Sequence, residues 1–224
     1  METDLWVAVD LNHYRKSAER FTMDRILHYR GILERHIKAH PEFRDSLTPV
    51  VPPGGVHPLI LDMSEASLAA GTGPMSAVAG AVAEYVCRDL LAEFDADEVI
   101  VENGGDIFMK LTSPVAVAVH AGDSPLSDKI ALQIKPEETP LSLCCSSGTV
   151  GHSLSFGIAD ACMVACTSGA AADAFATSFC NRVKNAGMVH EVTEMAISEP
   201  LIISAVIIAG DKLGIGGQIE VKIL

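Results

Sequence analysis

The hydrophobic and polar positions of the first hundred residues follow two different periods. The stretch "DLWVAVDL" (4–11) alternates as a β-strand does, and residues 21–40 carry apolar side chains at helical spacing with charges between them. The next long segment, "HPLILDMSEASLAAGTGPMSAVAGAVAEYVCRDLLAEF", predicts two helices separated at Gly71, Gly73 and Pro74, with Pro74 near the first turn of the second. This part of the chain therefore predicts one strand followed by helices.

From residue 97 the pattern changes to short strands. These are "DEVIVE", "DIFMKL", "VAVAVHA", "KIALQI", "LSLCC" and "DACMVAC", then "LIISAVIIAG" and "QIEVKIL" after a helix over about 169–186. Together the elements predict an α+β fold, with a mixed, largely antiparallel sheet layered with helices. The connector "PVVPPGG" (49–55) is rigid because of its prolines. We expect a single domain over 1–224, with residues 1–50 as a possible sub-lobe.

Composition narrows the classes of partner. The 224 residues are 49% hydrophobic and carry 16 basic against 29 acidic side chains, for a formal net charge of −13. Such a surface repels nucleic acid and anionic lipid. The amino terminus lacks a basic segment followed by an apolar one, and "LIISAVIIAG" is far shorter than the roughly 20 residues of a membrane span. We expect a cytoplasmic protein that binds neither nucleic acid nor a membrane.

Cysteine and histidine pairs raise the question of a transition-metal site. Cys162 and Cys166 lie four residues apart on a predicted strand, and about 13 Å of separation is too far to share one ion. His36 and His40 lie one turn apart on a predicted helix, which fits either an exposed helix face or a metal site that lacks an evident third ligand. The six cysteines are expected to be free and mostly buried thiols.

The stretch "VENGGDIF" places Asn103, Gly104, Gly105 and Asp106 between two predicted strands. Asn-Gly is a strong signal for a tight hairpin turn. The same glycines would also admit a ligand to the backbone, with the side chains of Asn103 and Asp106 supplying directional polar groups beside it. Spacing alone leaves both interpretations open.

The segment "SSGTVGHSLS" (146–155) offers several hydroxyl groups and no charge apart from that of His152. It suits an anionic ligand or a sharp turn. It is not a Walker loop, because no lysine or arginine occurs between Lys135 and Arg182, so an anion held here would need backbone amides, hydroxyls and a metal. His152 is the one residue of the segment that titrates near neutrality and is a candidate base.

The segment "SGAAADAFATSFCNRV" predicts a helix of mostly small residues, with Asp173 and Thr177 on one face. A carboxylate and a hydroxyl one turn apart can both coordinate Mg2+, which prefers oxygen ligands and commonly bridges to phosphates. The alternative is structural: the Thr177 hydroxyl bonds back to the carbonyl of Asp173, and Asp173 favours the positive end of the helix.

Read in order, "VENGGDIF", "SSGTVGHS", "ACMVAC" and "AADAFATSF" resemble the ApbE superfamily, whose characterised members are Mg-dependent FAD:protein FMN transferases. Within it the chain is similar to a short branch from anaerobic bacteria and archaea, on the stretches "GPMSAVAGAVAEYV", "SPLSDKI" and "GDKLG". The match to the transferases covers mainly residues 99–182. The resemblance implies a T-fold-related architecture.

The resemblance also implies roles for individual residues. Asp173 and Thr177 correspond to magnesium ligands of the transferases, and His152 lies in the region of their transfer histidine, although "SLSFGIAD" after it lacks their Asp-Pro pair. The cofactors would be Mg2+ with FAD or FMN, and a protein acceptor of FMN would be a partner. The expected nucleotide contacts are Asn103, Gly104, Gly105, Asp106, Ser146, Ser147, Gly148 and Thr149.

Two hypotheses of function follow. The first is a protein that binds a flavin nucleotide or related phosphate ligand through Mg2+, with FMN transfer as a possible activity. The second is a non-catalytic or sulfur-handling protein of anaerobic metabolism that uses Cys144 and Cys145. In this hypothesis a cysteine thiol beside His152 has a pKa below its usual value of about 8.5. We also expect a homodimer, with the small-residue helix over 75–86 as a close contact surface.

Overall fold

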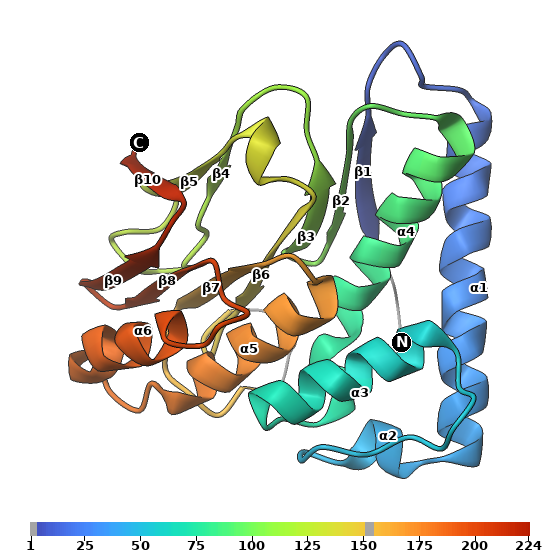
Figure 1. Cartoon of the computed structure of the whole chain (residues 1–224). Helices are drawn as coiled ribbons and strands as arrows, with labels where there is room; N and C mark the ends of the chain where they lie inside the picture. Colours follow the sequence, from blue (N-terminus) through green and yellow to red (C-terminus); the bar gives the residue numbers. More distant parts are fainter. Residues whose placement is uncertain (1–3, 151–154) are drawn as a thin grey trace.

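A computed structural model describes residues 4–150 and 155–224 and contains two antiparallel sheets with helices against the larger one (Figure 1). The large sheet has the strand order β1-β2-β3-β6-β7-β8-β9, and the small sheet has the order β10-β5-β4. The predicted α+β class is confirmed. The strands are β1 (Leu5–Val9), β2 (Val99–Asn103), β3 (Asp106–Lys110), β4 (Val115–Ala118), β5 (Ile130–Ile134), β6 (Leu141–Ser146), β7 (Ala161–Cys166), β8 (Ser204–Ala209), β9 (Lys212–Gly217) and β10 (Glu220–Ile223).

The helices cover one face of the large sheet and the small sheet covers part of the other, which gives two hydrophobic cores. Strand β7 shows why both faces are apolar: Val164 packs toward the helices, whereas its neighbour Met163 packs toward the small sheet. The helices are α1 (Ser17–Ala39), α2 (Glu42–Asp45), α3 (Pro58–Ala70), α4 (Val78–Phe94), α5 (Gly169–Arg182) and α6 (Val189–Ile197), with 3-10 turns η1 (Pro74–Ala77), η2 (Pro136–Glu138) and η3 (Ala186–Met188).

The predicted break between two helices is confirmed, because α3 ends at Ala70 and Gly71 takes the left-handed conformation, with φ of 70°. Strand β9 and helix α6 are among the elements that the sequence analysis did not predict. Strand β9, "KLGIGG", is half glycine, which weakens the strand signal. Helix α6 has nine residues, too few for helical periodicity to stand out.

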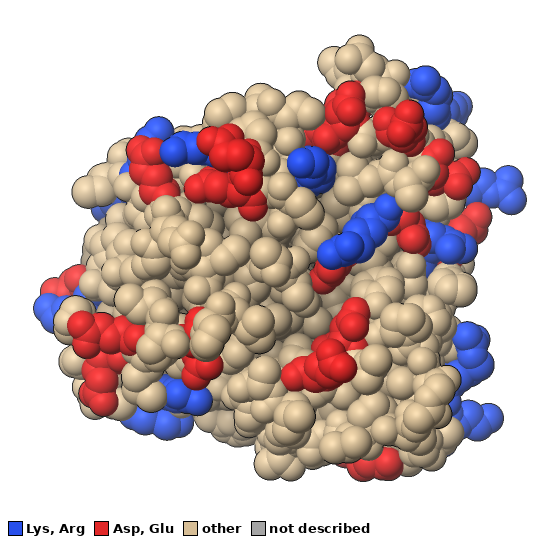
Figure 2. Space-filling model, in the orientation of Figure 1, with Lys and Arg blue, Asp and Glu red and all other residues tan. Residues whose placement is uncertain are grey.

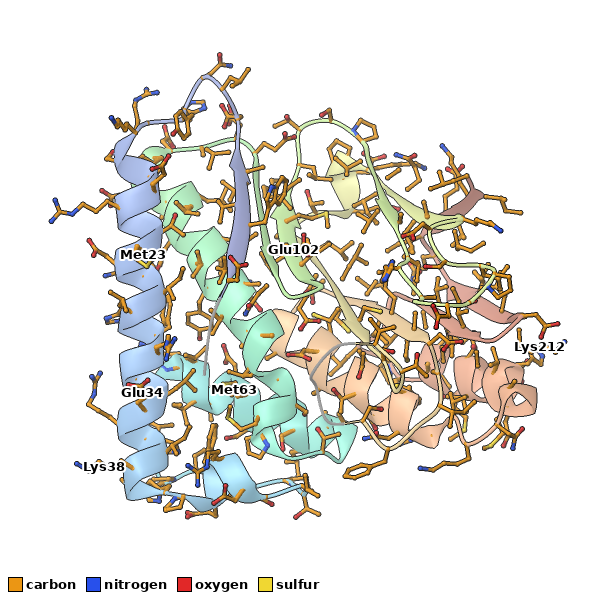
Figure 3. All side chains as sticks on the ribbon, turned by 180° about the vertical axis from the view of Figure 1, so that it is seen from behind. Met23, Glu34, Lys38, Met63, Glu102 and Lys212 are labelled. Atoms are coloured by element: carbon orange, nitrogen blue, oxygen red, sulfur yellow. The ribbon has the colours of Figure 1, made fainter. Side chains whose placement is uncertain are left out.

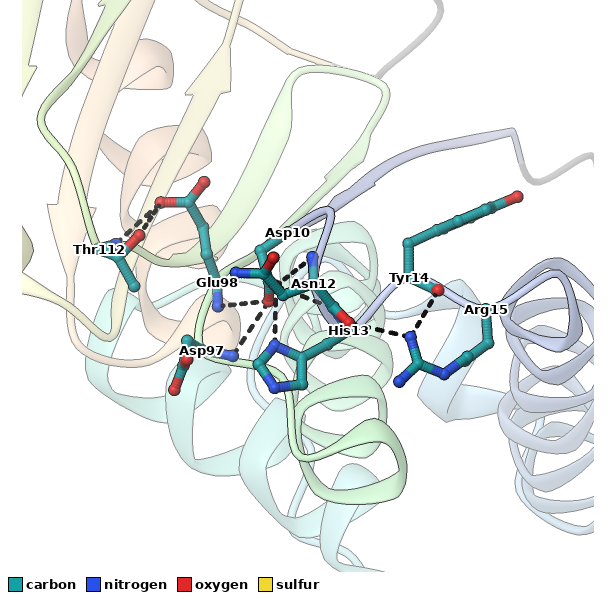
Figure 4. A network of polar contacts seen from close by, with 8 residues as sticks. All are labelled: Asp10, Asn12, His13, Tyr14, Arg15, Asp97, Glu98 and Thr112. Carbon is teal, nitrogen blue, oxygen red and sulfur yellow. Dashed lines mark hydrogen bonds and ion pairs between the residues drawn. The ribbon is translucent and has the colours of Figure 1, made fainter.

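The side chain of Asp10, which follows β1, binds the turn between β1 and α1 to the start of β2 (Figure 4). Its Oδ1 accepts hydrogen bonds from the backbone N–H of His13 at 3.0 Å and from the His13 ring at 2.8 Å. Its Oδ2 accepts from the backbone N–H of Asp97 at 3.2 Å and of Glu98 at 3.3 Å, just before β2. One carboxylate therefore fixes the turn into α1 relative to the start of β2.

The small-residue segment over 75–86 does not provide the self-association surface that we expected. Ala77, Gly80, Ala81 and Ala83 are buried within the chain itself, where α4 packs against α5 and the sheet. Whether the protein forms a homodimer through another surface stays a prediction. No single helix in the described part of the chain is long and apolar enough to cross a membrane, although α3 and the η1–α4 segment reach that length and composition together across a bend of 107°.

Candidate functional site

The site is built on a close contact between the first turns of α4 and α5. Gly80 and Gly169 face each other, and a Cβ atom on either would collide with the backbone oxygen of the other. The Glu84 carboxylate accepts a hydrogen bond from the Gly169 N–H at 2.6 Å. Because glycine alone leaves this space, the two helix backbones approach closely enough for side chains of α5 to reach the start of α4.

The side chain of Asp173, on α5, reaches the start of α4 because the two helices are close together. Its Oδ2 accepts hydrogen bonds from the backbone N–H groups of Ala79 and Gly80, both at 3.0 Å. These N–H groups belong to the first turn of α4, whose N-cap residue Ala77 supplies no side-chain cap. Asp173 therefore caps a neighbouring helix, where the helix dipole favours a negative charge. Its Oδ1 makes no hydrogen bond to another residue that the structure describes.

The turn between β2 and β3 is joined to the same place. Asn103 and Asp106 pair across the ends of the two strands, and Gly104 and Gly105 between them have φ angles of 64° and 101°. The predicted hairpin turn is thus confirmed. The Asn103 amide donates to the backbone oxygen of Ala79 at 3.1 Å, so the turn is attached to the start of α4. Beyond the glycine Cα atoms the space is open, because a Cβ there would meet no atom of the described residues within 4 Å.

Asp106 brings a second carboxylate. Its Oδ1 accepts a hydrogen bond from the backbone N–H of Cys145 at 3.1 Å, and only 8% of the residue is exposed. Burial raises the pKa of Asp106 well above its usual value, and the negative charge of Asp173 raises it further. Glu102 of β2, labelled in Figure 3, adds a smaller effect in the same direction.

Burial also raises the pKa of Asp173, to about 7, although the N–H groups of Gly80 and Ala79 oppose the shift. No lysine, arginine or histidine among the described residues forms an ion pair with Asp106 or Asp173. Asp106, which is buried, and Asp173, which is partly exposed, therefore form an acidic pair without a counter-charge among the described residues, an arrangement that favours protonation or a bound cation.

Thr177 lies one turn beyond Asp173, and the two are partly exposed positions in a helix whose other central residues are buried. The back-bonding alternative is not observed, because no hydrogen bond joins the Thr177 hydroxyl to the Asp173 carbonyl. Thr22 and Thr193 do make this bond in their own helices. The predicted shared face is confirmed, and the Thr177 hydroxyl makes no hydrogen bond to another residue that the structure describes.

The donor set suits a hard cation better than a transition metal. Among the described residues, no three histidine, cysteine, aspartate or glutamate side chains are placed to hold one ion. Cys162 and Cys166 are buried on β7, and His36 packs its ring against Phe43, with His40 alongside. Two carboxylates and a hydroxyl fit Mg2+, which keeps several waters and is commonly held by one or two carboxylates plus substrate phosphates.

Comparison with known proteins places the chain in a family. The family model described as "AbpE bacteria" matches residues 1–200. The chain belongs to this AbpE family. Among the relatives, the UPF0280 protein of Methanocaldococcus jannaschii is 36% identical over 223 residues, which cover 97% of this chain and 88% of the relative. The UPF0280 protein of Methanocella arvoryzae is 36% identical over 197 residues, 88% of this chain and 80% of the relative.

The chain also shares its fold with a solved structure, the apo form of the flavinyl transferase ApbE from Pseudomonas stutzeri. The TM-score is 0.55, with 11% sequence identity over 96% of this chain and 94% of the other. At this identity the similarity shows the fold alone. The family resemblance inferred from the motifs is confirmed, whereas the role of each site residue stays a prediction.

In this AbpE protein the hydroxyls of the segment after β6 are largely bonded within the chain. The Ser147 hydroxyl accepts hydrogen bonds from the N–H groups of Thr149 at 3.1 Å and Val150 at 2.8 Å. The Thr149 hydroxyl donates to Asp160 at 2.8 Å. The sharp-turn interpretation therefore accounts for these two hydroxyls.

The glycine of the same segment serves packing. A Cβ atom on Gly148 would collide with the backbone of Gly157, and one on Gly157 would collide with the carbonyl of Cys180 at the end of α5. Ser146, the last residue of β6, is buried. His152, the predicted base, lies outside the described residues, and its role stays a prediction.

The two adjacent thiols of the AbpE protein lie on β6, in surroundings that oppose ionisation. Burial raises the pKa of Cys144 well above its usual value, and the charges of Asp106 and Asp173 add to the effect. Burial and Asp106 raise the pKa of Cys145 to about 12. The sulfur-handling hypothesis requires a lowered pKa, so this environment opposes it.

Proposed function

We propose that this protein binds a phosphate-bearing flavin nucleotide through Mg2+. The observation that carries the proposal is the pair of the buried Asp106 and the partly exposed Asp173, which has no cationic partner among the described residues. Thr177, one turn from Asp173, makes no side-chain hydrogen bond to another described residue. A divalent cation would offset the burial that raises both pKa values, and the charge of Asp173 that raises the pKa of Asp106 further. It would also supply the positive charge that a phosphate needs in a stretch of chain without lysine or arginine.

In this proposal Asp173 and Thr177 of α5 hold the cation, and Asp106 adds negative charge from the start of β3. When bound, Mg2+ would neutralise and polarise phosphate oxygens. The residues of the β2–β3 turn serve the ligand in two ways. Gly104 and Gly105 leave open space for its approach, and the amide of Asn103, held by the Ala79 carbonyl, fixes the turn against α4.

Calorimetry tests the binding proposal. The metal-free protein is titrated with Mg2+ alone, and then with FAD, FMN and ADP, each with and without Mg2+. We expect Mg2+-dependent heat with at least one nucleotide. Asp173→Asn keeps the shape of the side chain but removes its charge, and should weaken Mg2+ binding by about tenfold or more, or about 1.4 kcal/mol.

The matched control is Asp89→Asn, which alters a partly exposed carboxylate toward the carboxyl end of α4 that accepts a hydrogen bond from Tyr29 of α1. It should leave Mg2+ binding unchanged. An absence of heat with every nucleotide, or equal affinities in both variants, would show that the proposal is wrong.

FMN transfer to a protein acceptor is a further step of the proposal, supported by the fold shared with a flavinyl transferase. Transfer of FMN from FAD would form an ester bond between the FMN phosphate and an acceptor hydroxyl, break the pyrophosphate bond of FAD, and release AMP and the hydroxyl proton. The test is AMP release from FAD in the presence of Mg2+ and a candidate acceptor protein. Nucleotide binding without AMP release would retain the binding proposal and argue against transfer.

A further inference from the structure

A second hollow lies away from the carboxylate pair, between α1, α2 and η1. It encloses about 430 Å3. Its apolar lining is formed by Leu33, Ile37, Pro41 and Met75, and its charged lining by Arg30, Glu34, Lys38 and Arg44. We call it the α1–α2 groove. No residue of the proposed magnesium site contributes to it.

The groove lies in the basic part of an acidic chain. Residues 15–45 hold eight of the 16 lysines and arginines but only five of the 29 acidic residues. Figure 2 shows several of these basic side chains along the edge that α1 forms. The rest of the chain is therefore strongly acidic, whereas the basic surroundings of the groove attract anionic ligands.

The basic groups of the groove are available to a ligand. Lys38 forms no ion pair with another described residue, and Figure 3 shows it on α1 near Glu34. Arg30 lies 3.5 Å from Glu34, whose side chain is 69% exposed. Arg44 pairs with its exposed neighbour Asp45. Because exposed pairs of this kind contribute little free energy, both guanidinium groups can exchange these partners for an anion.

We propose that the α1–α2 groove binds a small ligand that combines an anionic head with an apolar body. The volume lies within the range of about 300 to 1,000 Å3 typical of small-molecule sites. The floor of Leu33, Ile37 and Met75 would take the apolar body, and the rim of Arg30, Lys38 and Arg44 would take the head. The ligand would also contact η1, the turn that leads into the α4 residues bonded by Asp173.

The probe is 8-anilinonaphthalene-1-sulfonate, an aromatic anion whose fluorescence rises in apolar surroundings. The native protein should bind it saturably, and the triple variant Arg30→Gln, Lys38→Gln, Arg44→Gln should bind it about tenfold or more weakly. The matched control is Arg20→Gln with Arg35→Gln, which removes two charges from α1 outside the groove. It should bind the probe about as well as the native protein does.

Two further arms identify the chemistry. N-phenyl-1-naphthylamine lacks the sulfonate, so its binding should not distinguish the triple variant from the native protein. Octanoate and octyl phosphate share an apolar chain, and the one that displaces the probe at lower concentration shows whether the head is a carboxylate or a phosphate. Circular dichroism and thermal melting check that every variant is folded.

The proposal would be overturned by an absence of saturable binding, by equal binding of the folded triple variant and the native protein, or by an equal loss in the Arg20 and Arg35 control. A loss of probe binding in Asp173→Asn would place the probe at the carboxylate pair, and would likewise overturn it. Failure of magnesium or nucleotide binding in calorimetry leaves the groove untouched, because the two sites share no side chain.

Discussion

Two parts of the molecule present oxygen atoms at the same end of the large sheet, and they differ in how many of those atoms are already bonded. The hydroxyls of Ser147 and Thr149 make hydrogen bonds within the chain. Asp106 and Asp173 accept backbone N–H bonds but have no cationic partner among the described residues. A hydroxyl-rich sequence is therefore a weaker guide to a ligand than a buried carboxylate pair.

The two parts also differ in what positions them. The hydroxyl segment is held by local turns and by the packing of Gly148 on Gly157. The carboxylate pair depends on the contact of α4 with α5, elements far apart in the sequence. Damage to that contact should therefore affect the carboxylate pair more than the hydroxyl segment.

The largest expected effect comes from Gly169→Ala, whose Cβ would collide with the backbone of Gly80. Because overpacking typically costs about 1–3 kcal/mol, we expect a loss of this size in the free energy of unfolding, measured by urea denaturation. The control is Gly54→Ala, where a Cβ meets no described atom within 4 Å, and which should change stability by less than about 0.5 kcal/mol. Equal stabilities in the two variants would contradict the close contact.

The next effect concerns pH. The pKa of Asp173 is raised from 3.8 to about 7, so the folded, metal-free protein holds this proton more tightly than the unfolded chain does. The resulting stabilisation is fully present below pH 3.8 and is lost as the pH rises through about 7. The slope is at most about 1.4 kcal/mol per pH unit for one proton.

Urea denaturation between pH 4 and pH 8 in a metal chelator measures this dependence. Asp173→Asn should flatten the profile, because the amide does not titrate. A wild-type protein that gains stability across this range, or a variant with the same profile, would argue against the buried acidic pair.

A smaller effect is expected in the hydroxyl segment. Thr149→Val removes the hydrogen bond to Asp160 and should lower the free energy of unfolding by about 1 kcal/mol. The affinity for Mg2+ alone should stay within about twofold, because this hydroxyl is already bonded within the chain. A tenfold loss of Mg2+ affinity would show that the comparison between the two regions is wrong.

The features of the fold and of the candidate site that depend on neighbouring residues could be predicted from the sequence. The turn at Gly104 and Gly105 follows from the Asn-Gly pattern, and the shared face of Asp173 and Thr177 follows from helical spacing. The partners of Asp173 could not be predicted, because Ala79 lies 94 residues earlier and offers only a backbone N–H. The run of small residues around it predicted a close contact, which we assigned to a second copy of the chain, whereas in the structure it packs against α5.

The hydroxyl-rich segment over 146–155 shows what composition alone cannot predict. Its composition suited either an anionic ligand or a sharp turn, because composition does not show which groups are bonded within the chain. The acceptor of the Thr149 hydroxyl is Asp160, eleven residues later, and the packing partner of Gly148 is Gly157. Only the folded arrangement shows that turn geometry uses these groups.

The central claim is that Asp106 and Asp173 form a cation site, and the pH dependence of Mg2+ affinity tests it most directly. Because Mg2+ competes with the proton that the pair retains, calorimetric affinity should rise with pH by up to about tenfold per unit below pH 7, and level off above it. In Asp173→Asn the affinity should be weaker and should rise less steeply with pH, because Asp106 alone then exchanges a proton for the cation. Equal Mg2+ affinities in the wild-type protein and Asp173→Asn at every pH from 5.5 to 8 would contradict the account.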